Sequence, residues 1–244
     1  MTSFSIILNS DKTNFITSFS PVLELNQNHN YEIALVNLET YYSFPNITDQ
    51  NNKFRYSLDV GVWNDIIIPT GSYELSQLND EIFRIMKSRD HYDKHDNKSF
   101  ISLGANFATL KCIIEISNPQ LVINFDTDNS LRNVLGFNKQ ILRKSYNESD
   151  NPVNILSINS ILVECSIIEG SYVNGIHEPI LYSFFPKCLP GEKIIETPKN
   201  LIYLPLITKT ISNIKIQLKD NNDNDLDLRG ETITLRLHIR SIRE

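Results

Sequence analysis

The sequence ETITLRLHIR, residues 231–240, is the clearest indication of fold class in this chain. Apolar and polar residues alternate strictly from Thr232 to Arg240. The apolar members of the run are Ile233, Leu235, Leu237 and Ile239. Because successive side chains of a β-strand point to opposite faces of the sheet, these four share one face, and we expect that face to be buried. The run 214–218 alternates in the same way, so the chain is predicted to end in two strands joined by the polar segment 220–227.

Four earlier segments extend this β pattern. The alternating runs 110–116 and 121–125 lie on either side of Pro119, and we expect them to form a β-hairpin. Residues 31–41 (YEIALVNLETY) are apolar on both faces, which is typical of a central strand covered on each side. Residues 161–169 (ILVECSIIE) have the same character.

The composition favours a folded β protein. Hydrophobic residues make up 41% and charged residues 21%, which excludes global disorder. The chain is rich in Ile, which packs well on pleated sheets, and in Asn, which favours turns, whereas it has only 8 Gly. A net charge of -6 argues against a sequence-independent nucleic-acid binder, which needs a surplus of Lys and Arg. The three cysteines are an odd number with no C-x-x-C motif, so we expect them to be reduced.

Membrane insertion and secretion are not expected. The longest apolar runs are only a few residues long, whereas a membrane span needs about 20. The N-terminal residues have no basic region followed by a long apolar run, so no secretory signal peptide is expected.

One segment, Tyr73–Arg89, has the spacing of an amphipathic helix. Its apolar residues form one stripe at a period of 3.6 residues, and they are Leu75, Leu78, Ile82, Ile85 and Met86. Ser72 is expected to cap the helix, Glu74 suits its positive end, and Lys87 and Arg89 suit its negative end.

We expect one domain spanning residues 1–244. A chain of 244 residues is long enough for one sizeable domain or for two small ones, and it has no internal repeat or low-complexity linker. If the chain were divided, the polar stretch 145–154 is where an internal boundary would fall, although a surface loop is the preferred interpretation.

Two segments have the residue types of a metal site. Asp220, Asn222, Asn224 and Glu231 match positions one, three, five and twelve of a calcium-binding loop. Asp225 stands where that loop needs glycine, and the flanking segments are predicted strands rather than helices. Residues 91–96 (HYDKHD) also combine imidazoles and carboxylates. We expect both segments to be solvated loops, with no metal and no cofactor.

No catalytic residue is assigned. The sequence has no G-x-S-x-G, H-E-x-x-H, G-x-x-x-x-G-K-[ST] or G-x-G-x-x-G motif. We therefore expect a protein that is not an enzyme.

Aromatic residues gather at the ends of two predicted strands. Five of them are candidates for interface anchors, and they are Tyr41, Tyr42, Phe44, Tyr182 and Phe185. From the sequence, burial in the core is as good an explanation for each of them.

The order of several short motifs resembles the penton-type minor capsid proteins of Maverick/Polinton elements and of related adenovirus-like (adintovirus-like) viruses of invertebrates. The motifs are FSPVLEL at 19–25, YEIALV at 31–36 with YSFPNI at 42–47, IPTGSY at 68–73, SLRNVLGF at 130–137, LVECSIIE at 162–169 and LHIR at 237–240. Each motif is short and hydrophobic, and the resemblance depends on their order along nearly the whole chain.

The resemblance implies an all-β jelly-roll β-sandwich into which the helix is inserted. It further implies a structural capsid protein of the virion, assembled inside the host cell as a homopentameric vertex ring that contacts a major capsid protein. The chain is short for a penton-type protein, which leaves little room for a receptor-binding insertion. Two alternatives stay open: a small jelly-roll major capsid-type protein of the same elements, and a non-catalytic β-sandwich module that binds a carbohydrate or a receptor.

Overall fold

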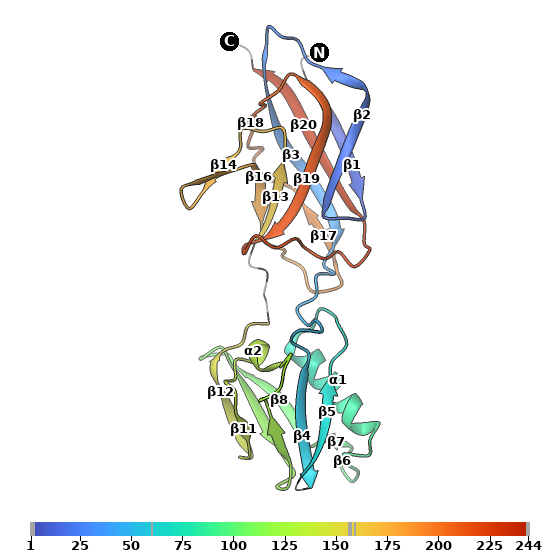
Figure 1. Ribbon diagram of the computed structural model, residues 1–244, viewed down its shortest axis with the longest axis vertical. Helices are drawn as coiled ribbons and strands as arrows, with labels where there is room; N and C mark the ends of the chain where they lie inside the picture. Colours follow the sequence, from blue (N-terminus) through green and yellow to red (C-terminus); the bar gives the residue numbers. More distant parts are fainter. Residues whose placement is uncertain (1–2, 60, 156–157, 159, 243–244) are drawn as a thin grey trace. The chain divides into compact units, whose positions relative to one another are not determined.

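A computed structural model describes residues 3–59, 61–155, 158 and 160–242, and the chain divides into two compact units (Figure 1). The first unit combines residues 1–44 with 158–244, and the second consists of residues 45–157. The second unit is therefore an insertion into the chain of the first.

Two sheets form the first unit. Their strands are β1 (Ser3–Ser10), β2 (Asn14–Glu24), β3 (Asn30–Tyr41), β13 (Ile161–Cys165), β16 (Ile180–Phe184), β17 (Lys193–Glu196), β19 (Thr210–Asp220) and β20 (Ile233–Ile242). The order in one sheet is β1-β20-β3-β17, with the short β18 (Leu204–Pro205) also paired to β3, and in the other it is β16-β13-β19-β2. The hairpin of β14 (Ser171–Val173) and β15 (Ile176–Glu178) lies between β13 and β16 in the sequence.

This strand order is that of a jelly roll. The first three strands of the chain alternate between the two sheets, β13 and β16 are neighbours in one sheet, and the last strands alternate again. All of these pairings are antiparallel. Two sheets with four main strands each, connected in this way, are the jelly-roll architecture. The predicted all-β jelly-roll class is confirmed, and the insertion lies in the connection between β3 and β13.

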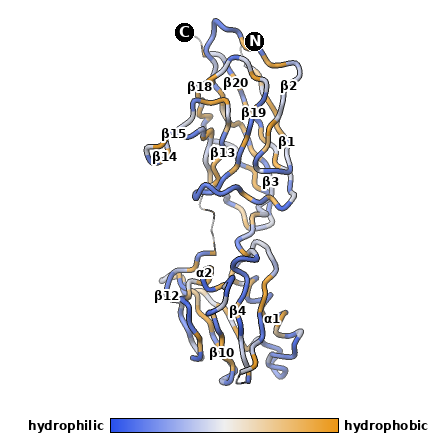
Figure 2. Tube along the Cα trace, viewed as in Figure 1, coloured by the Kyte–Doolittle hydropathy of each residue, from blue (hydrophilic) through white to orange (hydrophobic). Residues whose placement is uncertain are grey.

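The core of the first unit follows the predicted alternation. Ile233, Leu235, Leu237 and Ile239 of β20 are all fully buried. They pack with apolar residues of β3, β13 and β19 in one continuous cluster. Figure 2 shows hydrophobic and hydrophilic residues interleaved along the strands. The strand β3 pairs with β20 on one side and with β17 and β18 on the other, so its predicted central position is confirmed.

The second unit has its own core. Its strands are β4 (Lys53–Asp59), β5 (Val62–Ile67), β6 (Tyr92–Asp93), β7 (Lys98–Ser99), β8 (Ile101–Asn106), β9 (Lys111–Ile116), β10 (Val122–Asn124), β11 (Ile141–Leu142) and β12 (Tyr146–Pro152). They form the sheets β11-β10-β4-β5 and β12-β9-β8 and the short hairpin β6-β7. The helices are α1 (Leu75–Lys87) and α2 (Arg132–Leu135). Apolar side chains of both larger sheets and both helices form a second buried cluster.

The predicted amphipathic helix is α1, although it begins two residues later than expected. Leu78, Ile82 and Met86 are its buried residues. Glu74 rather than Ser72 is the N-cap, and its backbone N–H donates to the side chain of Gln77 at 2.9 Å. The helix contacts β8, β5 and the β6-β7 hairpin, so it belongs to the core of the inserted unit.

The predicted hairpin of residues 110–125 is wrong. β9 pairs with β8 and β12, whereas β10 pairs with β4 and β11. The turn at Pro119 carries the chain from one sheet to the other. Both strands do turn their apolar residues into the same core. The alternation therefore identified the buried faces but not the strand partners.

The two compact units differ from the single domain expected from the sequence. Residues 146–152, which were expected to be a loop, form β12 in the second unit. The chain passes from one unit to the other between Phe44 and Pro45 and again between Ser157 and Ile158. The composition does not change at these points, because both units are built from the same Ile-rich strands and Asn-rich turns.

Candidate functional site

Tyr42 and Phe44 do not fit the predicted role of interface anchors. Both side chains are buried in the core of the jelly roll, where their rings lie 5.5 Å apart. The backbone N–H of Tyr42 donates to Glu192 O at 2.8 Å, and its carbonyl accepts from Gly191 N–H. Burial raises the pKa of the Tyr42 hydroxyl. These two aromatics therefore stabilise the fold rather than an outer surface.

The other three candidates lie nearer the surface. Tyr41 and Phe185 are exposed, at the end of β3 and directly after β16. Tyr182 is half-buried, its ring is stacked on that of Phe184, and its hydroxyl donates to Glu196 Oε1 at 2.8 Å. Desolvation and this carboxylate raise the pKa of Tyr182 to about 12. Tyr41 and Phe185 remain available to a partner, whereas Tyr182 is engaged within the unit.

Seven of the exposed apolar residues of the jelly roll lie on or beside its edge strands. The strand orders place β16 and β17 at one edge of the sandwich and β1 and β2 at the other. The group at the β16/β17 edge consists of Tyr41, Phe185, Leu189 and Ile195, and the group at the β1/β2 edge consists of Ile7, Ile16 and Val22. We call the group at the β16/β17 edge the G edge and the group at the β1/β2 edge the B edge.

The sequence reasoning missed the B edge. Ile7 lies between the buried Ile6 and Leu8, so its side chain points away from the core. Ile16 likewise follows the inward-facing Phe15. The available signal was an apolar residue at a position where the alternation of the strand calls for a polar one.

The acidic loop at the end of β19 is stabilised by hydrogen bonds and ion pairs among its own and neighbouring residues. The Asp220 carboxylate accepts from the backbone N–H groups of Asn222 and Asn224, at 2.8 and 2.9 Å, and from the Asn224 side chain at 3.0 Å. Lys219 bonds to Asp223 at 2.7 Å and to Glu164 at 3.0 Å, and these contacts raise the pKa of Lys219 to about 12. These bonds stabilise the turn. Glu231 is exposed, and its backbone N–H donates to Leu228 O.

The residues of the HYDKHD segment also find partners close by. His91 Nδ1 lies 2.7 Å from the Tyr56 hydroxyl, and His95 Nδ1 lies 2.8 Å from the Asp96 carboxylate. The segment contributes β6 to the hairpin with β7. In the described part of the chain no three His, Cys, Asp or Glu side chains are grouped as a metal site would require.

The cysteines are free thiols. Cys112 lies in the core of the inserted unit and Cys165 in that of the jelly roll. Burial raises the pKa of Cys112 to about 12 and that of Cys165 to about 11. Thiols with such values are poor nucleophiles at neutral pH.

Neither helix found within the described ranges has the length and apolar character needed to cross a membrane.

The architecture defines a class, namely a single jelly roll that carries a compact insertion between its third and fourth strands. The chain matches the crystal structure of the mavirus penton protein over 98% of its own length and 100% of that chain, with a TM-score of 0.50 and 12% sequence identity. The match covers both units, and at this identity it shows a shared fold. No protein-family model matches the sequence, and no curated protein matches it. The chain thus shares its fold with the mavirus penton protein, which agrees with the fold that the resemblance implied.

Proposed function

We propose that this protein is a structural subunit of a viral capsid and that it forms the pentameric ring at the vertex. The observation that carries the proposal is the fold match to a penton protein, which extends through both the jelly roll and its insertion. Shell subunits act by packing against one another, so this role requires no catalytic group and no cofactor.

The surface of the jelly roll supports a ring. Subunits around a fivefold axis meet through two different patches, because each subunit contacts one neighbour with one side and the next neighbour with the other. The G edge and the B edge are two different apolar patches on opposite sides of the sandwich. Each contact is expected to bury on the order of 1,200–2,000 Å² in total. We propose Tyr41 and Phe185 as anchors on the G edge.

The proposal includes partners and a location. The ring would contact copies of a major capsid protein and would be part of the virion. We do not propose direct contact with the genome, because the chain has a net charge of -6.

The mass of the purified protein in solution tests this function. Light scattering over a range of concentrations and salt conditions should give a particle of five chain masses, and electron microscopy should show a fivefold ring. A protein that stays monomeric under all of these conditions, and also when mixed with its major capsid protein, would contradict the vertex role. Trimers or hexamers would instead favour a facet protein of the same shell.

A further inference from the structure

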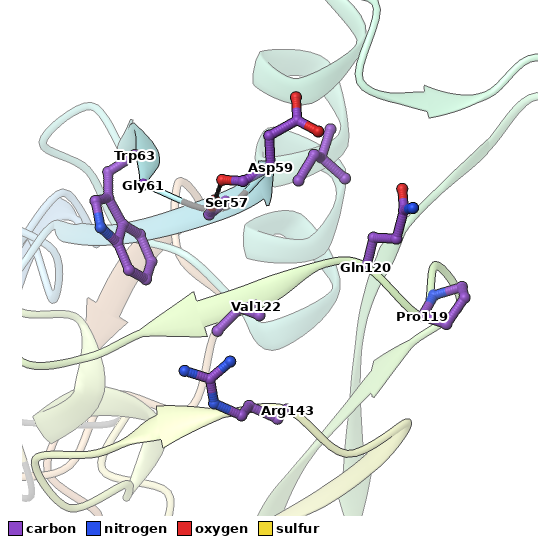
Figure 3. A pocket seen from close by; sticks show the side chains of 9 residues that line it. Ser57, Asp59, Gly61, Trp63, Pro119, Gln120, Val122 and Arg143 are labelled. Atoms are coloured by element: carbon purple, nitrogen blue, oxygen red, sulfur yellow. Dashed lines mark hydrogen bonds between the residues drawn. The ribbon is translucent and has the colours of Figure 1, made fainter.

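The inserted unit has a surface pocket that the vertex role does not use. It occupies about 470 Å³ at one end of the sheet β11-β10-β4-β5 (Figure 3). The lining residues are Ser57, Leu58, Asp59, Gly61, Trp63, Pro119, Gln120, Val122 and Arg143. This volume is within the usual range of small-molecule sites, about 300–1,000 Å³.

Strand register brings the wall of the pocket together from distant parts of the chain. Val122 of β10 pairs with Ser57 of β4, and β5, which carries Trp63, is the next strand beyond β4. Arg143 directly follows β11 on the other side of β10. Figure 3 shows the indole of Trp63 and the guanidinium of Arg143 extending toward the same space, with Val122 between them.

Trp63 is unusual because its large ring stays open to solvent. Its side chain belongs to the outward face of β5, and the residue is 41% exposed. An indole carries more apolar area than other side chains and usually packs in a core or against a ligand. Here the ring forms one wall of a hollow.

Three polar side chains line the rest of the pocket, with Gln120 at the far side from Trp63 (Figure 3). In the described part of the chain, the side chains of Asp59, Gln120 and Arg143 make no hydrogen bond or ion pair, and all three are exposed. They supply a carboxylate acceptor, an amide that both donates and accepts, and a guanidinium donor. One positive and one negative charge balance each other, which disfavours a polyanionic ligand such as nucleic acid.

We propose that this pocket binds a glycan, with one sugar ring placed against Trp63 and bonded to Arg143, and with Asp59 and Gln120 bonded to hydroxyl groups of the neighbouring sugar units. A sugar ring presents apolar C–H groups on one face and hydroxyl groups around its rim. The hydroxyls both donate and accept hydrogen bonds, so the ring matches an aromatic wall bordered by donors and acceptors together. The glycan site is independent of the vertex role, because the pocket lies within the inserted unit and its occupancy is measured separately from assembly.

Trp63 reports on its own site, since it is the single tryptophan of the chain. The full chain is titrated with lactose, maltotriose, chitotriose and sialyllactose while tryptophan fluorescence is recorded. At least one of these sugars should change the intensity or the emission maximum in a saturable manner. Saturation-transfer NMR with the same sugar then shows which of its protons approach the protein.

Three variants test the assignment by saturation-transfer NMR, which does not need the tryptophan. Trp63→Ala and Arg143→Ala should each weaken binding of that sugar, Trp63→Ala by at least about tenfold. Phe107→Ala is the matched control, because Phe107 is an 87% exposed aromatic of the same unit outside the pocket. Circular dichroism verifies that each variant is folded. If Trp63→Ala does not fold, Arg143→Ala still tests the assignment.

Several results would overturn the glycan site. One is a fluorescence spectrum that no sugar of the panel alters at millimolar concentration. Another is binding that Trp63→Ala and Arg143→Ala leave unchanged or that Phe107→Ala weakens equally. A response to an oligonucleotide or to a peptide but to no sugar would assign the pocket to a different ligand. None of these results depends on whether the subunits assemble into a pentameric ring.

Discussion

At the scale of single residues, Tyr42 and Phe185 differ in where their rings lie. Tyr42 is 9% exposed and Phe185 is 47% exposed. Tyr42→Asp places a charge in the core, so it should lower the free energy of unfolding by more than about 3 kcal/mol. Phe185→Asp should change this free energy by less than about 1 kcal/mol and weaken assembly instead. Urea unfolding monitored by circular dichroism, combined with light scattering, separates the two effects. Equal losses of stability would contradict the assignment of Tyr42 to the core and Phe185 to the surface.

Asp65 should make the inserted unit sensitive to acid. Its carboxylate lies 2.9 Å from Lys53 Nζ and 2.7 Å from Arg55 Nε. Burial alone would raise the pKa of Asp65, but hydrogen bonds and charge interactions with Lys53 and Arg55 outweigh it and lower the pKa below 3.8. The contribution to stability is therefore fully present above the unfolded value, near 3.8, and is lost as the pH falls through the lower, folded value.

Replacing Asp65 by Asn removes this dependence. The urea midpoint of Asp65→Asn should fall less between pH 6 and pH 3 than that of the unmodified protein. The same substitution at the exposed Asp128 is the control. An Asp65→Asn variant with an unchanged pH dependence would contradict a stabilising role for the ionised carboxylate.

At the scale of elements, Gly136 fixes how α2 leads toward β12. Its φ is +79°, and a Cβ atom there would lie 2.2 Å from Asn151 O and 2.8 Å from Pro152 O. Gly61 has a similar φ of +88°, but among the described residues other than its chain neighbours no atom lies within 4 Å of the same position. Gly61→Ala should therefore cost only the left-handed backbone conformation, about 1–2 kcal/mol.

Gly136→Ala should cost distinctly more than Gly61→Ala, because backbone atoms of the neighbouring strand must also move. Thermal unfolding of both variants measures the difference. Equal melting temperatures for the two variants would show that the close approach to β12 can relax without cost.

What the sequence predicted at this scale follows from what alternation can encode. The run in β20 specifies which side chains are buried, and they are buried. The runs in β9 and β10 specify their buried faces equally well, but pairing partners depend on chain segments far away. The pocket at Trp63 could not be predicted for the same reason, because it needs the order of four strands. Position at a strand end did not separate the buried Tyr42 from the exposed Tyr41.

At the scale of the whole molecule, the insertion should fold on its own. It has a separate apolar core, and Asn46 near its first residue is hydrogen-bonded to Ile155 near its last. The Asn46 side chain donates to Tyr73 O at 2.7 Å and to Ile155 O at 2.8 Å, and it accepts from Tyr73 N–H at 2.9 Å. A fragment of residues 45–157 should show cooperative thermal unfolding and a dispersed amide NMR spectrum.

Asn46→Ala should destabilise that fragment by about 1–3 kcal/mol, because two carbonyl groups and one N–H lose their partner. Asn133→Ala, at an exposed position of α2, is the control and should have little effect. A fragment that is unfolded at low temperature would mean that the insertion depends on the jelly roll for its stability.

The direction of assembly can be tested by mixing two defective subunits. Ile16→Asp damages the B edge and leaves the G edge intact, whereas Ile195→Asp does the reverse. In a head-to-tail ring each contact joins one G edge to one B edge, so either variant alone should remain monomeric. An equimolar mixture still has one intact edge of each kind, so it should form a dimer of the two different variants that cannot extend into a ring.

Native mass spectrometry distinguishes this dimer from monomers and pentamers, and Ile141→Asp in the inserted unit is the control that should keep the ring. A two-fold contact that joins two identical edges gives a different result. The variant in which that edge is intact would form dimers by itself, and mixing it with the other variant would not produce a new species. Dimers of a single variant would therefore exclude the head-to-tail arrangement that a vertex ring requires.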